Sequence, residues 1–435
     1  MNEALLPLAM AVLTLGGILM GYRVAMVLAG AAALFILISD LPVAYFNLLV
    51  SRIYANVLSN WLLVAIPMFI FMGLILEISG VAERSLRAAQ QALGGSAAGM
   101  GLSVLVIGVL LAASSGIVGA SVVLLALLAL PRLQETGYDK PTSAGLVAAS
   151  GTLAILIPPS VMLIVLGDQL QTPVPDMFAG AIGPGLLLVA AYGALVIWRA
   201  RRLPPVTRAA RVSPLRLLFD LGPLLALVVS VLGSIIAGLA TPTEASGLGA
   251  FGAVLVTLLY RRFSLPMLMQ AARKTVVTTA MVLFVMIGAT CFSAVFKGVG
   301  GDDLVEAGIM AFGSDPFTVL AVVMGAIFLL GFVLDWLEIT LILMPIFAPI
   351  VAALDFGNGL TGDALLVWFG ILVAVNLQTS FLTPPFGFSL FYLRGAAGDT
   401  LDTKDIYRGV APFIVLQLGV LALLILFPVL ITGLI

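Results

Sequence analysis

Oxygen-bearing side chains gather in two apolar segments, each just ahead of a double proline. The first segment reads Ser150-Gly151-Thr152 before Pro158-Pro159, and the second runs from Asn376 to Ser380 before Pro384-Pro385. Proline has no N–H and clashes with the preceding turn, so each pair is expected to break its helix. Inside a membrane, the backbone groups freed by a break are tolerated where they line a cavity or contact a ligand. Matching breaks in two halves of a chain therefore predict the central site of a transporter built from repeats.

A first hairpin tip is expected at Ser114-Ser115-Gly116, with Gly119 and Ser121 close behind it. Small residues permit an open turn, and the hydroxyl and carbonyl oxygens suit a cation such as sodium. Close helix packing through small residues is the alternative interpretation of the same stretch.

Two acids, Asp335 and Glu338, lie at a second expected tip between apolar arms. Acids within a membrane are costly and point to function. Asp335 is expected either to coordinate a cation or to hold the tip by accepting backbone N–H bonds. Glu338, one turn further on, could equally cap or pair, and Glu244 is expected to cap the helix that begins after Thr241.

The composition indicates an integral membrane protein. Of the 435 residues, 62% are hydrophobic and 9% are charged, whereas a soluble protein has roughly 25% charged residues. The single cysteine, Cys291, excludes an internal disulfide and a multi-cysteine metal site, and the lack of histidine favours sodium coupling over a proton relay. Nucleotide, zinc-protease and serine-hydrolase motifs do not occur in the sequence. We therefore expect a carrier rather than an enzyme, with sodium as coupling ion and with no cofactor, transition metal or nucleic-acid partner.

The positions of the basic residues predict a topology. If hairpins at 97–131 and 317–352 each enter and leave on one side, 18 of the 20 Lys and Arg residues fall inside the cell, as the positive-inside rule requires. Only Arg52 and Lys297 fall outside. This bias supports re-entrant hairpins, and both chain termini are then expected on the periplasmic side.

The order of the expected elements repeats along the chain. Residues 1–198 and 217–435 each hold two spans, an amphipathic stretch, a span, a hairpin, a broken helix and a last span. The Arg-rich linker 199–216 starts and ends on the cytoplasmic side, so the halves are expected to form an inverted repeat. The broken helices are expected at 141–170 and 364–393, and interfacial arms at about 41–58 and 264–274. The predicted fold is an all-α polytopic membrane protein.

Several ordered motifs are shared with one known family. They are Ala65-Ile-Pro67-Met-Phe69, Ser114-Ser115-Gly116, Gly137-Tyr138, Ile157-Pro158-Pro159-Ser160, Thr241-Pro-Thr-Glu244-Ala and the break at Pro384-Pro385. With these motifs the chain resembles, over essentially its whole length, the large membrane subunit of TRAP (tripartite ATP-independent periplasmic) transporters. The resemblance implies the ion transporter superfamily fold, with a scaffold domain and a transport domain that moves as an elevator.

The same resemblance implies sodium-driven uptake of small organic acids across the bacterial inner membrane. It implies a periplasmic substrate-binding protein and a small four-helix membrane subunit as partners. No four-helix segment is fused to this sequence, so that subunit is expected to be a separate chain. The stretches around Asp335-Trp-Leu-Glu338 and Gln378-Thr-Ser-Phe-Leu-Thr-Pro384 resemble a subgroup linked to keto or hydroxy acids.

By motif position, the resemblance implies two sets of binding residues. The sodium ligands would be Ser114, Ser115, Gly116, Ser150, Gly151, Thr152, Asp335, Thr340, Asn376 and Thr379. The substrate would lie between the hairpin tips, near Ser115, Gly119, Thr152, Pro158, Trp336, Gln378, Ser380 and Pro384. The first tip departs from the common Ser-Gly-Ser form of the family.

Three other functions are alternatives to this one. The first is a stand-alone cation- or proton-coupled carboxylate transporter that needs no binding protein. The second is a channel, which would show a continuous polar stripe along several spans, and the sequence lacks one. The third is an intramembrane enzyme using Asp335 and Glu338, but paired catalytic acids would be expected on separate facing helices.

Overall fold

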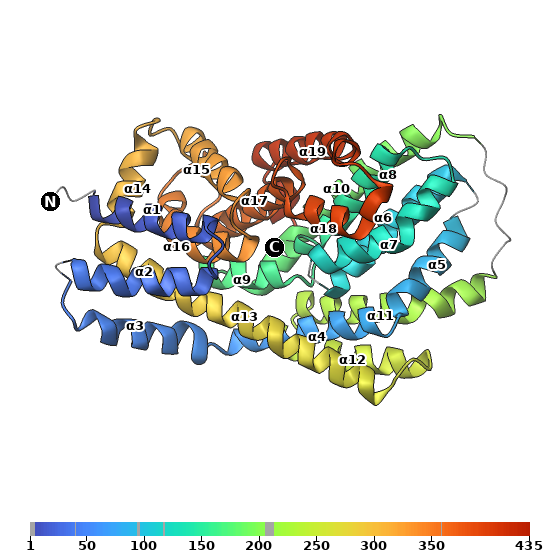
Figure 1. The fold of residues 1–435 in the computed structure, drawn as a ribbon, viewed down its shortest axis with the longest axis horizontal. Helices are drawn as coiled ribbons and strands as arrows, with labels where there is room; N and C mark the ends of the chain where they lie inside the picture. The colour runs from blue at the N-terminus through green and yellow to red at the C-terminus, as the bar shows by residue number, and fades with distance from the viewer. Residues whose placement is uncertain (1–4, 40, 94–95, 116–117, 205–212, 358) are drawn as a thin grey trace.

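The computed structural model describes residues 5–39, 41–93, 96–115, 118–204, 213–357 and 359–435, without the side chains of 112–115, 214 and 216. All secondary structure in these ranges is helical (Figure 1). Eight helices are long and apolar enough to cross a membrane within the described part of the chain. The expectation of an all-α membrane protein is confirmed.

The first half of the chain alternates long helices with short, interrupted ones. Its elements are α1 (Leu5–Leu19), α2 (Val24–Ile38), α3 (Tyr45–Ile53), the π-helix η1 (Tyr54–Leu58), the 3-10 helix η2 (Trp61–Val64), α4 (Ala65–Ile78), α5 (Val81–Leu93), α6 (Ala97–Ser115), α7 (Val118–Glu135), α8 (Lys140–Thr152), the 3-10 helix η3 (Leu153–Ile155), α9 (Val161–Leu170) and α10 (Val174–Ala200).

The second half follows a similar order. Its elements are α11 (Pro214–Ile236), α12 (Pro242–Leu259), α13 (Leu265–Gly298), α14 (Gly301–Met310), α15 (Pro316–Leu330), α16 (Trp336–Ala352), α17 (Gly362–Leu382), α18 (Phe388–Ala397), the 3-10 helix η4 (Gly398–Thr400), α19 (Thr403–Leu426) and α20 (Val429–Thr432). The two expected hairpins correspond to α6–α7 and α15–α16, and the two expected broken helices to α8–α9 and α17–α18.

One of the two expected interfacial arms is not a separate element. Residues 264–274 form the start of α13, a single helix of 34 residues, because no glycine or proline interrupts the sequence between Pro266 and Gly288. The first arm is separate: α3 passes into η1, and Asn60 then caps η2 by accepting a hydrogen bond from the N–H of Leu62. The amphipathic helices α5 and α14 were not expected from the sequence.

The helices divide into two groups in the view of Figure 1. Helices α2, α3, α4, α12 and α13 lie on the lower side of that view, and α13 packs against α2, α3 and α4. Helices α6 to α10 and α15 to α19 lie above them, where α8 packs against α7 and α19. The closest approach of α8 to α19 requires glycine, since a Cβ on Gly145 would collide with the carbonyl of Gly409.

The core of the upper group is α17. In its most apolar stretch 94% of the residues are buried, compared with 28% in α11. A helix that is hydrophobic all round and buried on every side lies inside a bundle rather than on its surface. Polar residues of α17, including the run from Asn376 to Ser380, therefore face protein rather than lipid.

Candidate functional site

Both double prolines break their helices, as the sequence predicts. In the first half α8 ends at Thr152, η3 follows, and α9 begins only at Val161. In the second half α17 ends at Leu382 and α18 begins at Phe388. A serine just past each break donates a hydrogen bond to a freed carbonyl ahead of it: Ser160 Oγ to Ile155 O at 2.8 Å, and Ser389 Oγ to Phe381 O at 2.6 Å. Both Pro-Pro peptide bonds are cis.

The two broken helices meet at Thr152 and Gln378. The Gln378 Nε2 atom donates a long, 3.4 Å hydrogen bond to Thr152 Oγ1, which itself donates to Ala149 O at 2.9 Å. Gln378 Oε1 and Ser150 Oγ are buried without a hydrogen-bond partner. Buried polar atoms are nearly always paired, so unpaired ones need an explanation such as an absent ion or water. The structure thus brings Thr152 and Gln378, two of the expected substrate-binding residues, into contact, and their role in binding stays a prediction.

The first hairpin packs onto the first broken helix. A Cβ on Gly108 of α6 would lie 2.6 Å from the Ser150 Cβ, and a Cβ on Gly151 would meet Val122 of α7. Small residues allow this close approach. Ser114 and Ser115 are the last residues of α6, but their side chains and Gly116 lie outside the described residues, so their predicted role as sodium ligands stays a prediction.

The acids of the second hairpin tip form a capping box. Asp335 is the N-cap of α16, with Oδ1 accepting a hydrogen bond from the N–H of Trp336 at 2.8 Å. The Glu338 carboxylate accepts a hydrogen bond from the N–H of Asp335. Of the two roles expected for Asp335, holding the tip is therefore observed, while coordination of a cation stays a prediction. Glu244 likewise forms a capping box with Thr241, as expected.

The remaining predicted sodium ligands bond mainly to nearby carbonyls. Thr340 Oγ1 donates to Trp336 O, and Thr379 Oγ1 donates to Val375 O. Asn376 Nδ2 donates to Met324 O at 2.7 Å and so ties α17 to the first arm of the second hairpin. Each hydroxyl uses its proton in this way and keeps lone pairs as an acceptor, which is compatible with binding a cation.

The second tip rests on α17 through Gly331 and Ser380. A Cβ on Gly331 would lie 2.8 Å from the Ser380 Cβ, which only glycine avoids. Ser380 Oγ donates to Leu377 O at 2.8 Å.

A cavity of about 160 Å³ lies where the two hairpins and the two broken helices face α4 and α13. Gly119 and Trp336, both predicted substrate-binding residues, line it together with Asp335. Thr152, Pro158, Gln378, Ser380 and Pro384 are not among its lining residues. We call this space the central cavity.

Aromatic side chains that the sequence analysis did not single out complete the central cavity. They are Phe381, Phe388 and Tyr392. The Tyr392 ring lies over Gly119, where a Cβ would come within 2.9 Å of it, and the rings of Phe381 and Phe388 pack edge to face with centroids 5.6 Å apart. Their clustering around the second break is visible in the sequence and could have marked them.

The comparisons with known proteins identify the family. A family model described as "Tripartite ATP-independent periplasmic transporter, DctM component" matches residues 8–430. The chain belongs to this family. It is thus a large permease subunit of the TRAP type, and the resemblance drawn from the motifs is confirmed.

Curated relatives agree with this assignment. An isethionate TRAP transporter permease protein of Oleidesulfovibrio alaskensis is 30% identical over 398 residues, which are 90% of this chain and 60% of that protein. The chain thus spans less than two thirds of that relative. A 2,3-diketo-L-gulonate TRAP transporter large permease protein of Escherichia coli is 28% identical over 95% of each chain. These relatives are transporter permeases rather than enzymes.

Solved structures share the fold. The YdaH transporter of Alcanivorax borkumensis aligns with a TM-score of 0.67 at 15% identity and covers 98% of each chain. The MtrF protein of Neisseria gonorrhoeae, described within a class of antimetabolite efflux pumps, aligns with a TM-score of 0.56 at 12% identity, covering 89% of this chain and 85% of that one. The helical architecture is therefore that of membrane transporters.

Proposed function

We propose that this TRAP permease carries a small organic acid across the bacterial inner membrane in symport with sodium. The observation that carries the proposal is the central cavity, which residues of both hairpins and of both broken helices line. Sites of this kind, formed where discontinuous helices meet, hold the substrate in transporters built from repeats.

The charge of the central cavity supports a coupling cation. Asp335 is the acid among its described lining residues, and no described lysine or arginine lines it. An organic anion entering beside an ionised Asp335 would be repelled in this low-dielectric setting unless a cation lay next to it. The unpaired Ser150 hydroxyl and Gln378 carbonyl oxygen, which belong to the two broken helices, would supply further uncharged oxygen ligands.

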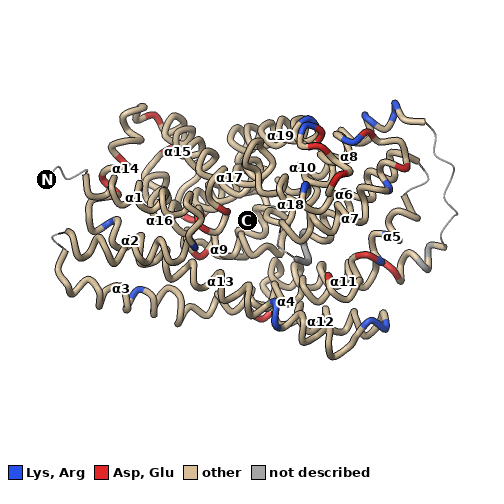
Figure 2. Tube along the Cα trace, in the orientation of Figure 1, with Lys and Arg blue, Asp and Glu red and all other residues tan. Residues whose placement is uncertain are grey.

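The orientation and the movement belong to the same proposal. In Figure 2 the Lys and Arg segments concentrate around α5, α8, α12 and α19, while few lie around α1 to α3 and α14 to α16. This asymmetry supports a cytoplasmic side at the former helices, with both termini periplasmic. The hairpins and broken helices would move as an elevator against a scaffold that includes α13.

The relatives suggest which partners and which transported acid to propose. Proteins of this family are named as components of tripartite transporters, so we propose a periplasmic binding protein and a small four-helix subunit as partners. Three relatives are named for isethionate, 2,3-diketo-L-gulonate and C4-dicarboxylates, and others for ectoine/5-hydroxyectoine and sialic acid. The first three are small acids with hydroxyl, keto or second acid groups, and on these three relatives we propose a keto or hydroxy acid here.

Uptake into proteoliposomes tests the proposal. The permease, its small subunit and the binding protein would be combined with labelled isethionate, 2,3-diketo-L-gulonate or succinate. We expect one of these acids to accumulate only with an inward sodium gradient and only when the binding protein is present.

The other outcomes separate the alternatives. Accumulation driven equally by a proton gradient in the absence of sodium would contradict sodium coupling. Uptake of free acid without the binding protein would instead identify a stand-alone carboxylate transporter.

A further inference from the structure

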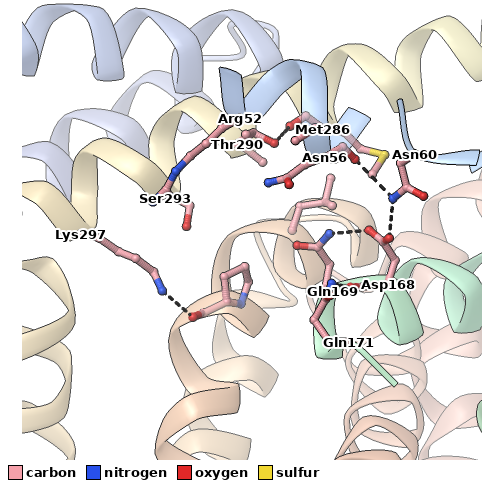
Figure 3. A pocket seen from close by; sticks show the side chains of 14 residues that line it. Arg52, Asn56, Asn60, Asp168, Gln169, Gln171, Met286, Thr290, Ser293 and Lys297 are labelled. Carbon is pink, nitrogen blue, oxygen red and sulfur yellow. Dashed lines mark hydrogen bonds between the residues drawn. The ribbon is translucent and has the colours of Figure 1, made fainter. Parts of the chain in front are cut away.

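A second cavity, of about 430 Å³, lies between the lower and the upper group of helices, where α3 and α13 face α9 and α16 (Figure 3). Its described lining is mostly polar. It includes Arg52 and Lys297, the two basic residues that are expected on the periplasmic side, and we call it the outer cavity. None of the predicted site residues lines it.

Two hydrogen bonds at the outer cavity join the two groups of helices (Figure 3). Asn60, between η1 and η2, donates from Nδ2 to Asp168 Oδ1 of α9 at 2.6 Å. Lys297, near the end of α13, donates from Nζ to Pro345 O of α16 at 3.0 Å. Among the side-chain hydrogen bonds between residues that the structure describes, these are the two that run from the lower group to the upper group.

Both donors are held in place on the lower side of the outer cavity. Asn60 Oδ1 accepts a hydrogen bond from the N–H of Leu62, so the cap of η2 also orients the amide that reaches Asp168. Lys297 Nζ lies 3.4 Å from Asp302 Oδ2, just beyond the end of α13. This ion pair offsets the charge of the lysine and fixes its position. The lower group therefore offers two oriented donors.

Both acceptors belong to the upper group. The second carboxylate oxygen of Asp168 accepts a hydrogen bond from Gln169 Nε2 at 2.9 Å, and its Oδ1 is the atom that faces Asn60. In α16 the usual helical partner of Pro345 O would be the N–H of residue 349, but Pro349 has none. A carbonyl freed inside a helix needs a partner from elsewhere, and Lys297 supplies it.

Around the central cavity, by contrast, the described surfaces of the two groups are mainly apolar. Ile70 of α4 and Val282 of α13 line it from below, and Val161 and Leu337 line it from above. Apolar contacts are not directional, so such surfaces can slide past each other. Hydrogen bonds weaken steeply with distance and angle. A displacement of the upper group would therefore break the two polar contacts first.

We propose that the Asn60–Asp168 and Lys297–Pro345 hydrogen bonds form a latch, which holds the upper group in the position seen here and opens in each transport cycle. The outer cavity beside them has room for water, which can bond the four partners once they separate. The latch rests on the elevator movement of the proposed function.

The distance between two spin labels tests the latch without requiring transport. In a Cys291→Ala background, Arg262→Cys after α12 labels the lower group and Lys140→Cys at the start of α8 labels the upper group, both at exposed positions. Pulsed electron–electron double resonance on the full chain in lipid nanodiscs gives the ratio of the observed position to displaced positions. The control pair, Lys140→Cys with the exposed Asp363→Cys of α17, has both labels in the upper group.

We expect each latch variant to lower this ratio about fivefold and to leave the control pair unchanged. Asn60→Ser keeps a residue that caps η2 but shortens the arm that reaches Asp168, and Lys297→Met removes the other donor. The exchange Asn60→Asp with Asp168→Asn swaps donor and acceptor and should keep the parent ratio within about twofold. Arg52→Gln, which alters the same cavity but no described bond of the latch, should not change the ratio.

Sodium with isethionate, added to the parent protein, separates failure of the latch from failure of the movement. If this addition changes the ratio while Asn60→Ser and Lys297→Met do not, the movement stands and the latch is overturned. If neither the addition nor any variant changes the distances, the elevator movement fails and the latch fails with it. A fall of the ratio in the exchange variant equal to that in Asn60→Ser would also contradict the latch, because the exchanged pair can still form the bond. Unfolding midpoints of all variants check folding separately.

Discussion

Asp335 combines two properties that can be separated by substitution. Its side chain caps α16, and its negative charge lies at the wall of the central cavity. Asparagine also caps helices well but carries no charge. The neutral variant therefore keeps the hairpin tip while removing the proposed cation ligand.

For Asp335→Asn we expect nearly unchanged thermal stability in choline but loss of the stabilisation that sodium gives the parent protein. A ligand that binds only the folded state stabilises it by about 2.7 kcal/mol at one hundred times Kd. The measurement is thermal unfolding of the purified chain with sodium or choline at constant ionic strength. Asp335→Ala serves as control, since losing the cap should cost about 0.5–2 kcal/mol in either salt. Full sodium stabilisation of Asp335→Asn would remove this residue from the ion site.

Gln378 forms a hydrogen bond between the two broken helices, yet its contribution to stability should be small. Its single described hydrogen bond is long, and its Oε1 atom is buried without a partner. Replacing an unsatisfied polar group by an apolar one of similar shape is often neutral. The buried amide is thus better explained by a ligand than by folding.

We expect Gln378→Met to change the free energy of unfolding by less than about 1 kcal/mol and to lower the rate of sodium-driven uptake at least tenfold. Uptake and thermal unfolding would be measured on the same preparation. Thr383→Val, which also removes one hydrogen bond on this segment but lies beyond the crossing, provides the comparison. Equal effects of the two variants on uptake would argue against a special role for Gln378.

At the scale of elements, the two breaks are the features from which the site is built. Each stops a helix next to polar residues, and a serine donates a hydrogen bond to one carbonyl at each break. A continuous helix would bond those carbonyls internally. Under the proposed function, carbonyls freed at the breaks would serve as acceptors for the cation.

Pro158→Ala combined with Pro159→Ala should weaken sodium affinity and slow uptake, because alanine allows the helix to close over the carbonyls. The check is the sodium concentration that gives half-maximal thermal stabilisation, which we expect to rise at least tenfold. Pro131→Ala, a proline inside α7, is the control for loss of a helical proline away from the break. Normal sodium affinity in the double variant would contradict the argument.

The sequence predicted these elements well because prolines and apolar length decide them locally. The hairpins at α6–α7 and α15–α16 and both broken helices lie within a few residues of their expected bounds. The prediction of a separate arm at 264–274 was wrong because this amphipathic stretch continues without a helix breaker into the apolar span that follows it. Helices α5 and α14 were missed because they are short and amphipathic.

The cavities were harder to predict than the helices. Gly119 and Trp336 were expected at the central cavity through the hairpin tips, but Phe388 and Tyr392 come from α18, whose position depends on packing across the whole bundle. Arg52 and Lys297 are 245 residues apart in the numbering, and nothing local indicates that one cavity contains both. Contacts between distant segments are set by tertiary packing, which periodicity does not reveal.

At the scale of the molecule, a small cluster ties the two halves of the chain together. Arg84 of α5 forms an ion pair with Asp220 of α11 at 2.5 Å, and its guanidinium lies over the Tyr260 ring, 4.4 Å from the centroid. The Tyr260 hydroxyl donates to the carbonyls of Phe219 and Asp220. Burial raises the pKa of Tyr260 to about 12, so this hydroxyl stays protonated at physiological pH. The cluster joins α5, α11 and α12.

We expect Asp220→Ala to lower the free energy of unfolding by about 1–2 kcal/mol, since it removes the Oδ1 atom to which both Nε and Nη2 of Arg84 bond, from a carboxylate that is itself only 10% exposed. The exchange Arg84→Asp with Asp220→Arg should recover part of this loss in a double-mutant cycle. Arg87→Ala removes the exposed pair with Glu83 on the same helix and should cost at most about 0.5 kcal/mol. A loss for Asp220→Ala no larger than that of Arg87→Ala would show that the cluster does not hold the halves together.

The same cluster has a consequence for biosynthesis. Arg84 and Asp220 are 136 residues apart, and ribosomes add about 5–20 residues per second, so α5 waits about 7–27 s for its partner after it leaves the ribosome. During that interval Arg84 on the polar face of α5 lacks the Asp220 carboxylate with which it will pair. Chaperones or the insertion machinery therefore contact this helix first. The membrane insertion of this permease should therefore be most sensitive to interruption between the synthesis of α5 and that of α11.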